Sequence, residues 1–206
     1  MNNEHTKGTN RFGKIIGTVI SLMALLIILS IVMDRIASCM NTEYFPRKYE
    51  KYVEKYAGEY GVPEAVAYAV IKVESDFEQY AVSSSDPPAK GLMQITEETF
   101  VWVGGHLLKE DTSVSKIYDP ETNIKYGIYL LSYLYGRFEN WETTYAAYNA
   151  GMSRVYTWLD DPRYSDGSGN LKDIPYPETR AYVKKVAEYR EKYEKLYYNE
   201  NKGAKK

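Results

Sequence analysis

Residues 62–95 read VPEAVAYAVIKVESDFEQYAVSSSDPPAKGLMQI, and this stretch decides the fold. Its first part carries apolar residues at the spacing of one helix face: Val66, Ala67, Val70 and Ile71. Pro63 suits the first turn of such a helix, because its fixed backbone angle is helical and its missing N–H is not needed there. Residues 62–75 are therefore predicted to form a helix that packs one face on a core.

Glu74 falls on the extension of the apolar stripe, near the C-terminal end of this predicted helix. Burial and the negative end of the helix dipole both disfavour a charged carboxylate at that place. A carboxyl group held neutral in this way can act as a general acid near neutral pH. The alternative is structural: the helix ends here, and Glu74 turns to water or caps a neighbour.

The chain around this helix is predicted to be mainly α-helical, with no internal repeat and no strand run. Residues 77–91 hold the serines and prolines typical of a loop or small ribbon. The other predicted helices span residues 46–60, 96–102 closed by Gly104-Gly105, 120–135, 141–149, 153–159 and a last one from Pro177 onward. Residues 161–170 are predicted to form a polar loop, so that loops between helices carry the site.

Residues 15–33, IIGTVISLMALLIILSIVM, carry no charge and are long enough as a helix to cross a hydrocarbon layer of about 30 Å. Lys7, Arg11 and Lys14 precede this stretch, so the positive-inside rule places the N-terminus in the cytoplasm. The stretch is longer than the apolar core of a cleaved signal peptide. We expect an uncleaved, single-pass anchor with the remaining chain outside the cell membrane.

A second interpretation of this region rests on Cys39. Residues 36–39, IASC, resemble a bacterial lipobox, in which the cysteine is acylated and becomes the new N-terminus. Asp34 and Arg35 interrupt the apolar core just before it, and Cys39 is otherwise a free thiol near the membrane. Either interpretation tethers the following domain to the membrane.

The composition excludes several kinds of chemistry. Among 206 residues there are 26 Lys+Arg and 28 Asp+Glu, a formal charge of −2, which disfavours nucleic acid as a partner. The two histidines, His5 and His106, and the single cysteine leave no disulfide and no Cys/His zinc cluster. We expect no metal or organic cofactor, and proton chemistry that rests on carboxylates.

Four blocks in the chain resemble the signature of the soluble lytic transglycosylase family, whose catalytic domain is similar to goose-type lysozyme. The blocks are ESDF, AVS and AKGLMQI within residues 74–95, residues 119–130, AYNAG at 147–151 and ETRAYV at 178–183. They occur in the family's order and cover about residues 48–190. The resemblance implies a lysozyme-like α-helical domain with a small loop or ribbon region.

The resemblance also implies an activity. Members of the family cleave the β-1,4 bond between N-acetylmuramic acid and N-acetylglucosamine in peptidoglycan glycan strands and leave a 1,6-anhydro end. Glu74 matches the family's single catalytic residue, which acts first as acid and then as base. The substrate's own N-acetyl carbonyl stabilises the charge at C1, so that no second carboxylate is required.

Five further residues match family positions that contact substrate: Ser83, Gln94, Tyr148, Asn149 and Glu178. Three of them have a structural alternative: turn capping for Ser83, a loop-stabilising amide for Gln94, and for Asn149 an amide that holds helix ends together. Tyr148 is expected to lie against the sugar and to bind its N-acetyl group. Glu178 is a candidate for steering Glu74 or binding saccharide, or is a partner of a helix dipole.

The chain departs from the family pattern at two places. Residues 84–88 form a connection about two residues longer than usual, with Pro88 where the family has glycine. Thr96 stands where the family often has methionine, which puts an apolar contact at that subsite in doubt. His106 matches no catalytic position and is expected to be structural or exposed.

Two other functions stay open at the level of the sequence. A hydrolytic muramidase on the same fold would need a carboxylate such as Asp86, Glu97 or Glu98 to orient water. An inactive peptidoglycan-binding protein would need none of this chemistry. A tethered enzyme suits cell-wall turnover, spore processes, or a secretion or conjugation apparatus.

The predicted division of the chain follows from these observations. It comprises a cytoplasmic N-terminus (1–14), the anchor (15–33), a linker (34–45), the catalytic domain (46–198) and a flexible tail (199–206).

Overall fold

The computed structural model describes residues 5–110 and 113–199. The chain divides into two compact units, one ending at Pro46 and the other beginning at Arg47, and each is described by itself. The first four residues of the expected cytoplasmic segment and residues 200–206 of the expected tail lie outside the described residues.

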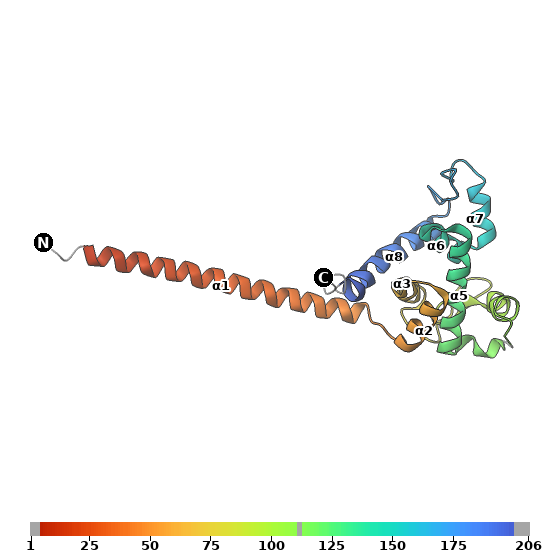
Figure 1. Ribbon diagram of the computed structural model, residues 1–206, viewed down its shortest axis with the longest axis horizontal. Helices are drawn as coiled ribbons and strands as arrows, with labels where there is room; N and C mark the ends of the chain where they lie inside the picture. Colours follow the sequence, from red (N-terminus) through yellow and green to blue (C-terminus); the bar gives the residue numbers. More distant parts are fainter. Residues whose placement is uncertain (1–4, 111–112, 200–206) are drawn as a thin grey trace. The chain divides into compact units, whose positions relative to one another are not determined.

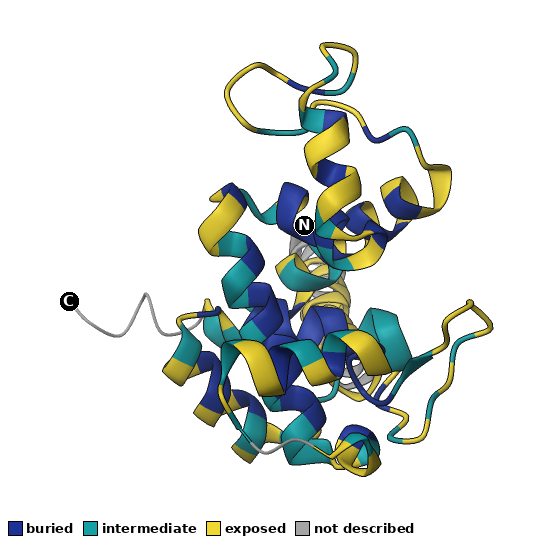
Figure 2. Cartoon of the chain, turned by 90° about the vertical axis from the view of Figure 1, so that its right-hand side faces the viewer, coloured by how far each residue is buried: buried dark blue, intermediate teal, exposed yellow. Residues whose placement is uncertain are grey.

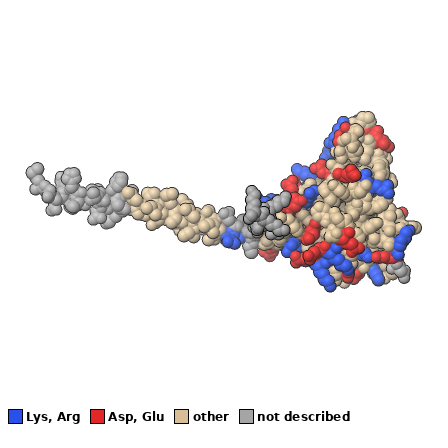
Figure 3. Space-filling model, viewed as in Figure 1, with Lys and Arg blue, Asp and Glu red and all other residues tan. Residues whose placement is uncertain are grey.

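The first unit is built on one long helix, α1 (His5–Tyr44). Its residues Ile16–Met33 have a mean hydropathy of 2.7 and are all exposed, so this segment is long and apolar enough to cross a membrane. The corresponding part of α1 carries no blue or red atoms in Figure 3. Helix α1 continues through most of the segment expected to be a linker, because residues 34–44 contain neither glycine nor proline. Cys39 therefore lies within a helix.

The second unit is mainly α-helical, as predicted, and its two longest loops are residues 76–88 before the ribbon and residues 160–176 before α8 (Figure 1). Its helices are α2 (Glu50–Tyr60), α3 (Glu64–Ser75), α4 (Glu97–Val101), η1 (Trp102–Leu107), η2 (Val114–Tyr118), α5 (Pro120–Phe138), α6 (Trp141–Ala150), α7 (Met152–Leu159), α8 (Pro177–Tyr193) and η3 (Glu194–Tyr198). Three of them begin with a side-chain cap, in which Thr96, Asp119 and Asn140 accept a backbone N–H from the first turn.

Two expected helix boundaries are wrong. Helix α2 begins at Glu50 rather than at Pro46, because Tyr49 takes a left-handed conformation with φ of 60°. The chain also does not stop at Gly104-Gly105, since the wide turn η1 passes through both glycines to Leu107. His106 is exposed in this turn, as expected.

A two-stranded antiparallel ribbon forms part of the region expected to be loop or ribbon. Strand β1 (Ala89–Lys90) pairs with β2 (Ile95–Thr96), with Ala89 opposite Thr96. The connection between the strands is held by the fully buried side chain of Asn123. Its Oδ1 accepts from the Met93 N–H at 2.8 Å, and its Nδ2 donates to the carbonyls of Lys90 and Ile117 at 3.2 and 2.8 Å.

Gly91 lets this connection approach α5 closely. Its φ is +78°, and a Cβ at this position would lie 2.4 Å from Nδ2 of Asn123. Only glycine fits such a contact in that conformation. The ribbon is therefore fixed to the N-terminal part of α5 by one amide and one glycine.

Helix α3 lies at the centre of the second unit. Every residue from Ala65 to Ile71 is buried, and the helix packs against α2 and α8. Helix α6 in turn packs against α5, α7 and α8. Figure 2 shows the buried residues gathered inside this helical cluster, with exposed residues around them. Residues 65–71 are thus buried on all sides of the helix and not on one face as predicted, because α3 is enclosed by its neighbours, and the end of α3 with Glu74 lies beside α8.

Candidate active site

A cleft of about 480 Å³ opens beside the C-terminal end of α3. Its walls come from the loop and ribbon, from α5 and α6, from α7 and from the start of α8. The lining residues include all six residues named as site candidates from the sequence: Glu74, Ser83, Gln94, Tyr148, Asn149 and Glu178. The fold therefore brings together side chains as far apart in the sequence as Glu74 and Glu178.

Glu74 lies in the last turn of α3, where the chain then reverses through Asp76 and Phe77, both with positive φ. Burial raises the pKa of its carboxyl group to about 7, and a hydrogen bond from Tyr182 partly opposes that shift. The effect is the one expected for a carboxyl withdrawn from water. Near neutral pH a substantial fraction of Glu74 is protonated and can donate a proton.

Tyr182 is the partner of Glu74, which the sequence interpretation missed. The spacing of tyrosines along residues 182–197 indicated packing, but the Tyr182 hydroxyl donates a hydrogen bond of 2.7 Å to Oε1 of Glu74. Its ring is buried between helices and packs as the spacing indicated, whereas its hydroxyl binds Glu74. The signal available in the sequence was its place in the block ETRAYV, four residues after the candidate Glu178.

Tyr148 lines the cleft from the last turns of α6. Its hydroxyl donates a hydrogen bond of 2.8 Å to the carbonyl of Met93, in the connection between the two strands. The proton of this hydroxyl is therefore committed to the protein, and its oxygen stays available as an acceptor. Burial raises the pKa of Tyr148 well above its ordinary value, so the hydroxyl stays neutral.

Ser83 and Gln94 both stabilise the loops of the cleft wall. The Ser83 hydroxyl accepts from the N–H of Ala89 at 2.8 Å and lies 2.6 Å from the hydroxyl of Ser85. Gln94, with a φ of 47°, donates its amide to the carbonyls of Ala81 and Gly91 at 3.1 and 2.8 Å. Both residues thus make the structural contacts expected in the alternative interpretation. Gln94 also lines the cleft, and its carbonyl oxygen takes no part in the two bonds that its amide NH₂ donates.

Asn149 and Glu178 line the cleft from the end of α6 and the start of α8. Asn149 is exposed, and its Oδ1 accepts a hydrogen bond of 2.8 Å from the hydroxyl of Thr179. This bond fixes the amide and leaves its NH₂ group for another acceptor. Glu178 lies in the first turn of α8 and is exposed, and it has no ion pair with any residue that the structure describes.

Residues at the two places where the chain departs from the family pattern also line the cleft. Thr96 and Thr99 line the cleft and share a hydrogen bond of 3.0 Å between their hydroxyls. Ser85, in the longer connection, also lines the cleft and donates to the carbonyl of Pro87. This edge is therefore rich in hydroxyl groups rather than apolar.

Three further residues of the wall were not singled out from the sequence. They are Arg154 of α7, Tyr176 just before α8, and Leu130 of α5. Tyr176 is 48% exposed, and its ring packs edge to face on Trp158 with centroids 5.1 Å apart. It gives the cleft an exposed aromatic surface.

The carboxylates considered for a hydrolase do not line this cleft. Asp86, Glu97 and Glu98 are all exposed, and Glu97 is paired with Lys90 at 2.5 Å. Within residues 5–110 and 113–199, no three His, Cys, Asp or Glu side chains form a group that could hold a metal ion. The carboxyl groups that line the cleft are those of Glu74 and Glu178.

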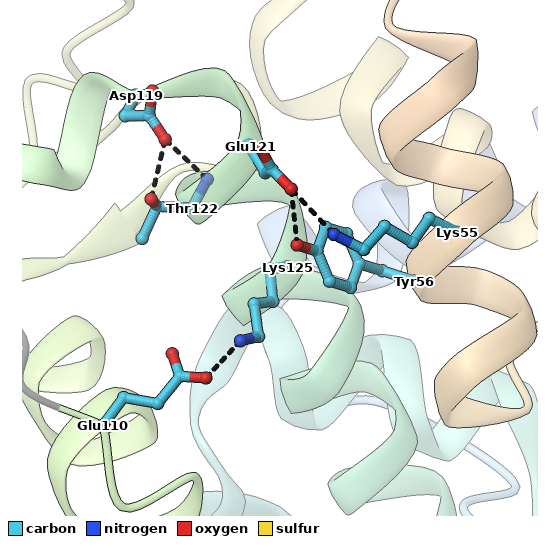
Figure 4. Close-up of polar contacts among 7 residues, drawn as sticks. All are labelled: Lys55, Tyr56, Glu110, Asp119, Glu121, Thr122 and Lys125. Atoms are coloured by element: carbon cyan, nitrogen blue, oxygen red, sulfur yellow. Dashed lines mark hydrogen bonds and ion pairs between the residues drawn. The ribbon is translucent and has the colours of Figure 1, made fainter.

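A second cavity of about 480 Å³ lies at the N-terminal part of α5, and Figure 4 shows its polar contacts. Glu121 accepts hydrogen bonds from Lys55 and from the Tyr56 hydroxyl at 2.9 and 2.8 Å. Lys125 is paired with Glu110. Because these charges neutralise one another, and the hydrogen bonds from Lys55 and Tyr56 lower the pKa of Glu121, we place the candidate active site in the cleft of Glu74.

Comparisons with known proteins identify relatives of the chain. A family model described as the transglycosylase SLT domain matches residues 51–169. The chain is 36% identical over 150 residues to the soluble lytic murein transglycosylase of Escherichia coli (strain K12). The aligned residues make up 71% of this chain and 23% of that protein. The chain is also 35% identical over 130 residues to the membrane-bound lytic murein transglycosylase C of Yersinia pestis (strain Pestoides F), covering 60% of this chain and 32% of that protein.

The fold is similar as well. The crystal structure of the 70 kDa soluble lytic transglycosylase from Escherichia coli superposes with a TM-score of 0.67 and 34% identity, covering 76% of this chain and 25% of that one. The chain thus spans about a quarter to a third of the length of these relatives.

Proposed function

The chain belongs to the transglycosylase SLT domain family, and from this premise we propose that it is a peptidoglycan lytic transglycosylase. It would cleave the β-1,4 bond between N-acetylmuramic acid and N-acetylglucosamine and form 1,6-anhydro-N-acetylmuramic acid. The observation that carries the proposal is the carboxyl group of Glu74, which lines the cleft with its pKa raised to about 7.

In the first step Glu74 acts as general acid. Oε1 accepts the hydrogen bond from Tyr182, so Oε2 is the oxygen assigned to hold the acidic proton and present it to the substrate. This proton is transferred to the glycosidic oxygen as its bond to C1 of the muramoyl residue breaks. The carbonyl oxygen of the substrate's N-acetyl group stabilises the positive charge at C1, so that the enzyme need not supply a second carboxylate.

In the second step the Glu74 carboxylate acts as base. It takes the proton of the C6 hydroxyl while the C6 oxygen forms a bond to C1, which closes the 1,6-anhydro ring. The proton lost in the first step is thereby regained, and no water is consumed. The hydrogen bond from Tyr182 stabilises the carboxylate during the interval between the two transfers.

The remaining wall residues suit a chain of N-acetylated sugars. The Tyr148 oxygen can accept the N–H of an acetamido group, since its own proton is bound to Met93. The NH₂ group of Asn149 can donate to a carbonyl or hydroxyl. Glu178 and the carbonyl oxygen of Gln94 can accept from sugar hydroxyls, and Ser83 holds the loop that shapes this wall.

The membrane placement forms part of the same proposal. Residues 16–33 would span the cell membrane once, with the N-terminus in the cytoplasm and the second unit on the extracytoplasmic side. Tethering confines cleavage to wall close to the membrane, which suits wall turnover or local opening for a secretion or conjugation apparatus.

Product analysis tests the proposal. Purified peptidoglycan is digested with the wild-type chain and with Glu74→Gln, and the fragments are identified by mass spectrometry. We expect fragments with anhydro ends, lighter by one water than hydrolysis products, and a loss of activity of at least about 10³-fold in Glu74→Gln. Reducing ends would show a hydrolytic muramidase instead, and intact glycan with binding alone would show an inactive peptidoglycan-binding protein.

A further inference from the structure

Arg154 is a basic side chain in the cleft wall, and its guanidinium is bound to a backbone carbonyl. Its Nη1 donates a hydrogen bond of 2.8 Å to the carbonyl of Ala150, one turn earlier in the chain. Among the residues that the structure describes, no carboxylate lies within ion-pair distance of its guanidinium. The other N–H groups of the fork are therefore available to a ligand.

The position of Arg154 is unfavourable for the helix that carries it. It lies in the first turn of α7, which holds no acidic residue, so a positive charge sits at the positive end of the helix dipole. By contrast, Glu178 in the first turn of α8 has the favourable sign. The hydrogen bond to Ala150 places the same charge at the C-terminal end of α6, where it is favourable. This contact uses one N–H group of the guanidinium, and the others remain for a ligand in the cleft.

Arginine selects a particular ligand chemistry. Its planar fork matches a carboxylate with two parallel hydrogen bonds, and it is the only basic residue among those that line the cleft in the described chain. N-acetylated sugar rings carry no charge, so a glycan backbone alone gives this guanidinium no counter-ion. The peptide attached to the muramoyl residue does carry free carboxylates.

We propose that Arg154 binds a free carboxylate of the peptide substituent on the muramoyl residue, so that the cleft selects strands that carry acidic peptides. This inference rests on the proposed function, because it assumes that glycan strands occupy the cleft. One N–H group of the guanidinium is bound to the carbonyl of Ala150, and the remaining N–H groups bind the peptide carboxylate. Arg154 is thus a specificity-determining residue, distinct from the residues that transfer protons.

Binding measurements separate this inference from the cleavage reaction. The full chain carrying Glu74→Gln, held in detergent micelles, is titrated calorimetrically with three soluble glycan fragments. The first carries its peptides, the second has the peptide carboxylates converted to amides, and the third has lost its peptides and exposes the lactyl carboxylate instead. The same titrations are made with Arg154→Gln and Arg154→Lys added to Glu74→Gln.

We expect amidation of the peptide to weaken binding to Glu74→Gln about tenfold, as for loss of a charge-assisted pair. With Arg154→Gln the amidated and free forms should bind equally, and Arg154→Lys should restore part of the difference. Equal weakening by amidation in all three proteins would overturn the proposal, as would an Arg154-dependent preference for the fragment with the lactyl carboxylate.

Arg163→Gln is the matched control. Arg163 is also exposed, but it is paired with Asp161 and lies outside the cleft. This variant should keep the full preference for free carboxylates. Thermal unfolding of each variant verifies that it is folded, and because no turnover is needed, absence of cleavage would refute the proposed function without deciding this inference.

Discussion

The hydroxyl of Tyr182 donates a hydrogen bond of 2.7 Å to Oε1 of Glu74, and so joins α8 to the end of α3 across 108 residues of sequence. Two opposing effects meet in this contact. Burial raises the pKa of Glu74, whereas the hydrogen bond favours the charged carboxylate and lowers it. The resulting pKa of about 7 suits a group that must lose and regain a proton in one reaction cycle.

Tyr182→Phe should shift the pH dependence of the reaction. Without the donor, burial acts alone, so the pKa of Glu74 rises and the alkaline limb moves upward by up to about one unit. The rate at neutral pH should fall about tenfold, because the carboxylate formed in the first step has lost its hydrogen bond. Initial rates of anhydro-product release across the pH range measure both effects. A lower rate with an unmoved pH profile would mean that Tyr182 acts only in packing.

The wild-type enzyme should lose activity in alkaline solution. Glu74 must be protonated to act as acid, so kcat/KM should fall toward tenfold per pH unit above the pKa of about 7 and level off below it. Rates measured on soluble glycan strands from about pH 5 to about pH 9 give the profile. A flat profile through neutral pH would contradict the assignment of Glu74 as acid.

The location of Glu74 could be predicted from the sequence because a helical stripe has a definite direction. The apolar period through residues 66–71 predicted a core-facing side for Glu74, although the structure buries every residue from Ala65 to Ile71, on all sides of the helix. The resemblance then brought Ser83, Gln94, Tyr148, Asn149 and Glu178 into one site, and they line one cleft.

Which hydrogen bonds these residues make could not be predicted. Tyr182 is near Glu74 only because α8 packs on α3, and helical spacing alone describes its ring rather than its hydroxyl. For Gln94 the sequence left two roles open, and only the structure shows that its amide binds the loop carbonyls of Ala81 and Gly91. A periodic pattern indicates which face is buried, but partners across helices depend on tertiary packing.

Asn123→Ala should destabilise the ribbon and the cleft together. The change leaves the Met93 N–H and the carbonyls of Lys90 and Ile117 buried without their partner. We expect a loss of roughly 3 kcal/mol or more in the free energy of unfolding, and lower activity because Met93 also holds Tyr148. Thermal unfolding and product release are the measurements.

Asn170→Ala provides the control for this change. Asn170 makes its amide contacts with Asp166 and Ser168 at the surface of the polar loop. Its removal should cost less than about 1 kcal/mol. Equal costs for the two variants would contradict the role given to the buried amide of Asn123.

Glu178→Gln should separate the three roles considered for this residue. An exposed carboxylate without an ion pair among the described residues, in the wall of the cleft, is suited to accept from sugar hydroxyls. Neutralising it should raise KM about fivefold and change kcat less. A shift in the pH profile would instead indicate that Glu178 steers Glu74. A change in thermal stability alone would indicate a partner of the α8 dipole.

Glu74→Gln should be more stable than the wild type, by an amount that depends on pH. The pKa of Glu74 rises from its ordinary value of 4.5 to about 7 on folding, so the folded state binds the proton more tightly than the unfolded state. Below the lower value both states are protonated, and the carboxyl costs nothing. Between the two values the unfolded chain releases its proton first, so stability falls as pH rises, by up to about 3 kcal/mol in total.

Glutamine avoids this cost because its amide does not ionise. The amide oxygen can still accept the hydrogen bond from Tyr182. Denaturant unfolding in detergent should therefore give equal stabilities near pH 4 and a growing advantage for Glu74→Gln up to about pH 8. All other titrating groups are common to both proteins, so the difference isolates Glu74. An advantage that does not change with pH would mean that Glu74 is not held protonated by the fold. A pH-dependent advantage, together with lost activity, would show that the fold gives up stability to hold the reactive proton.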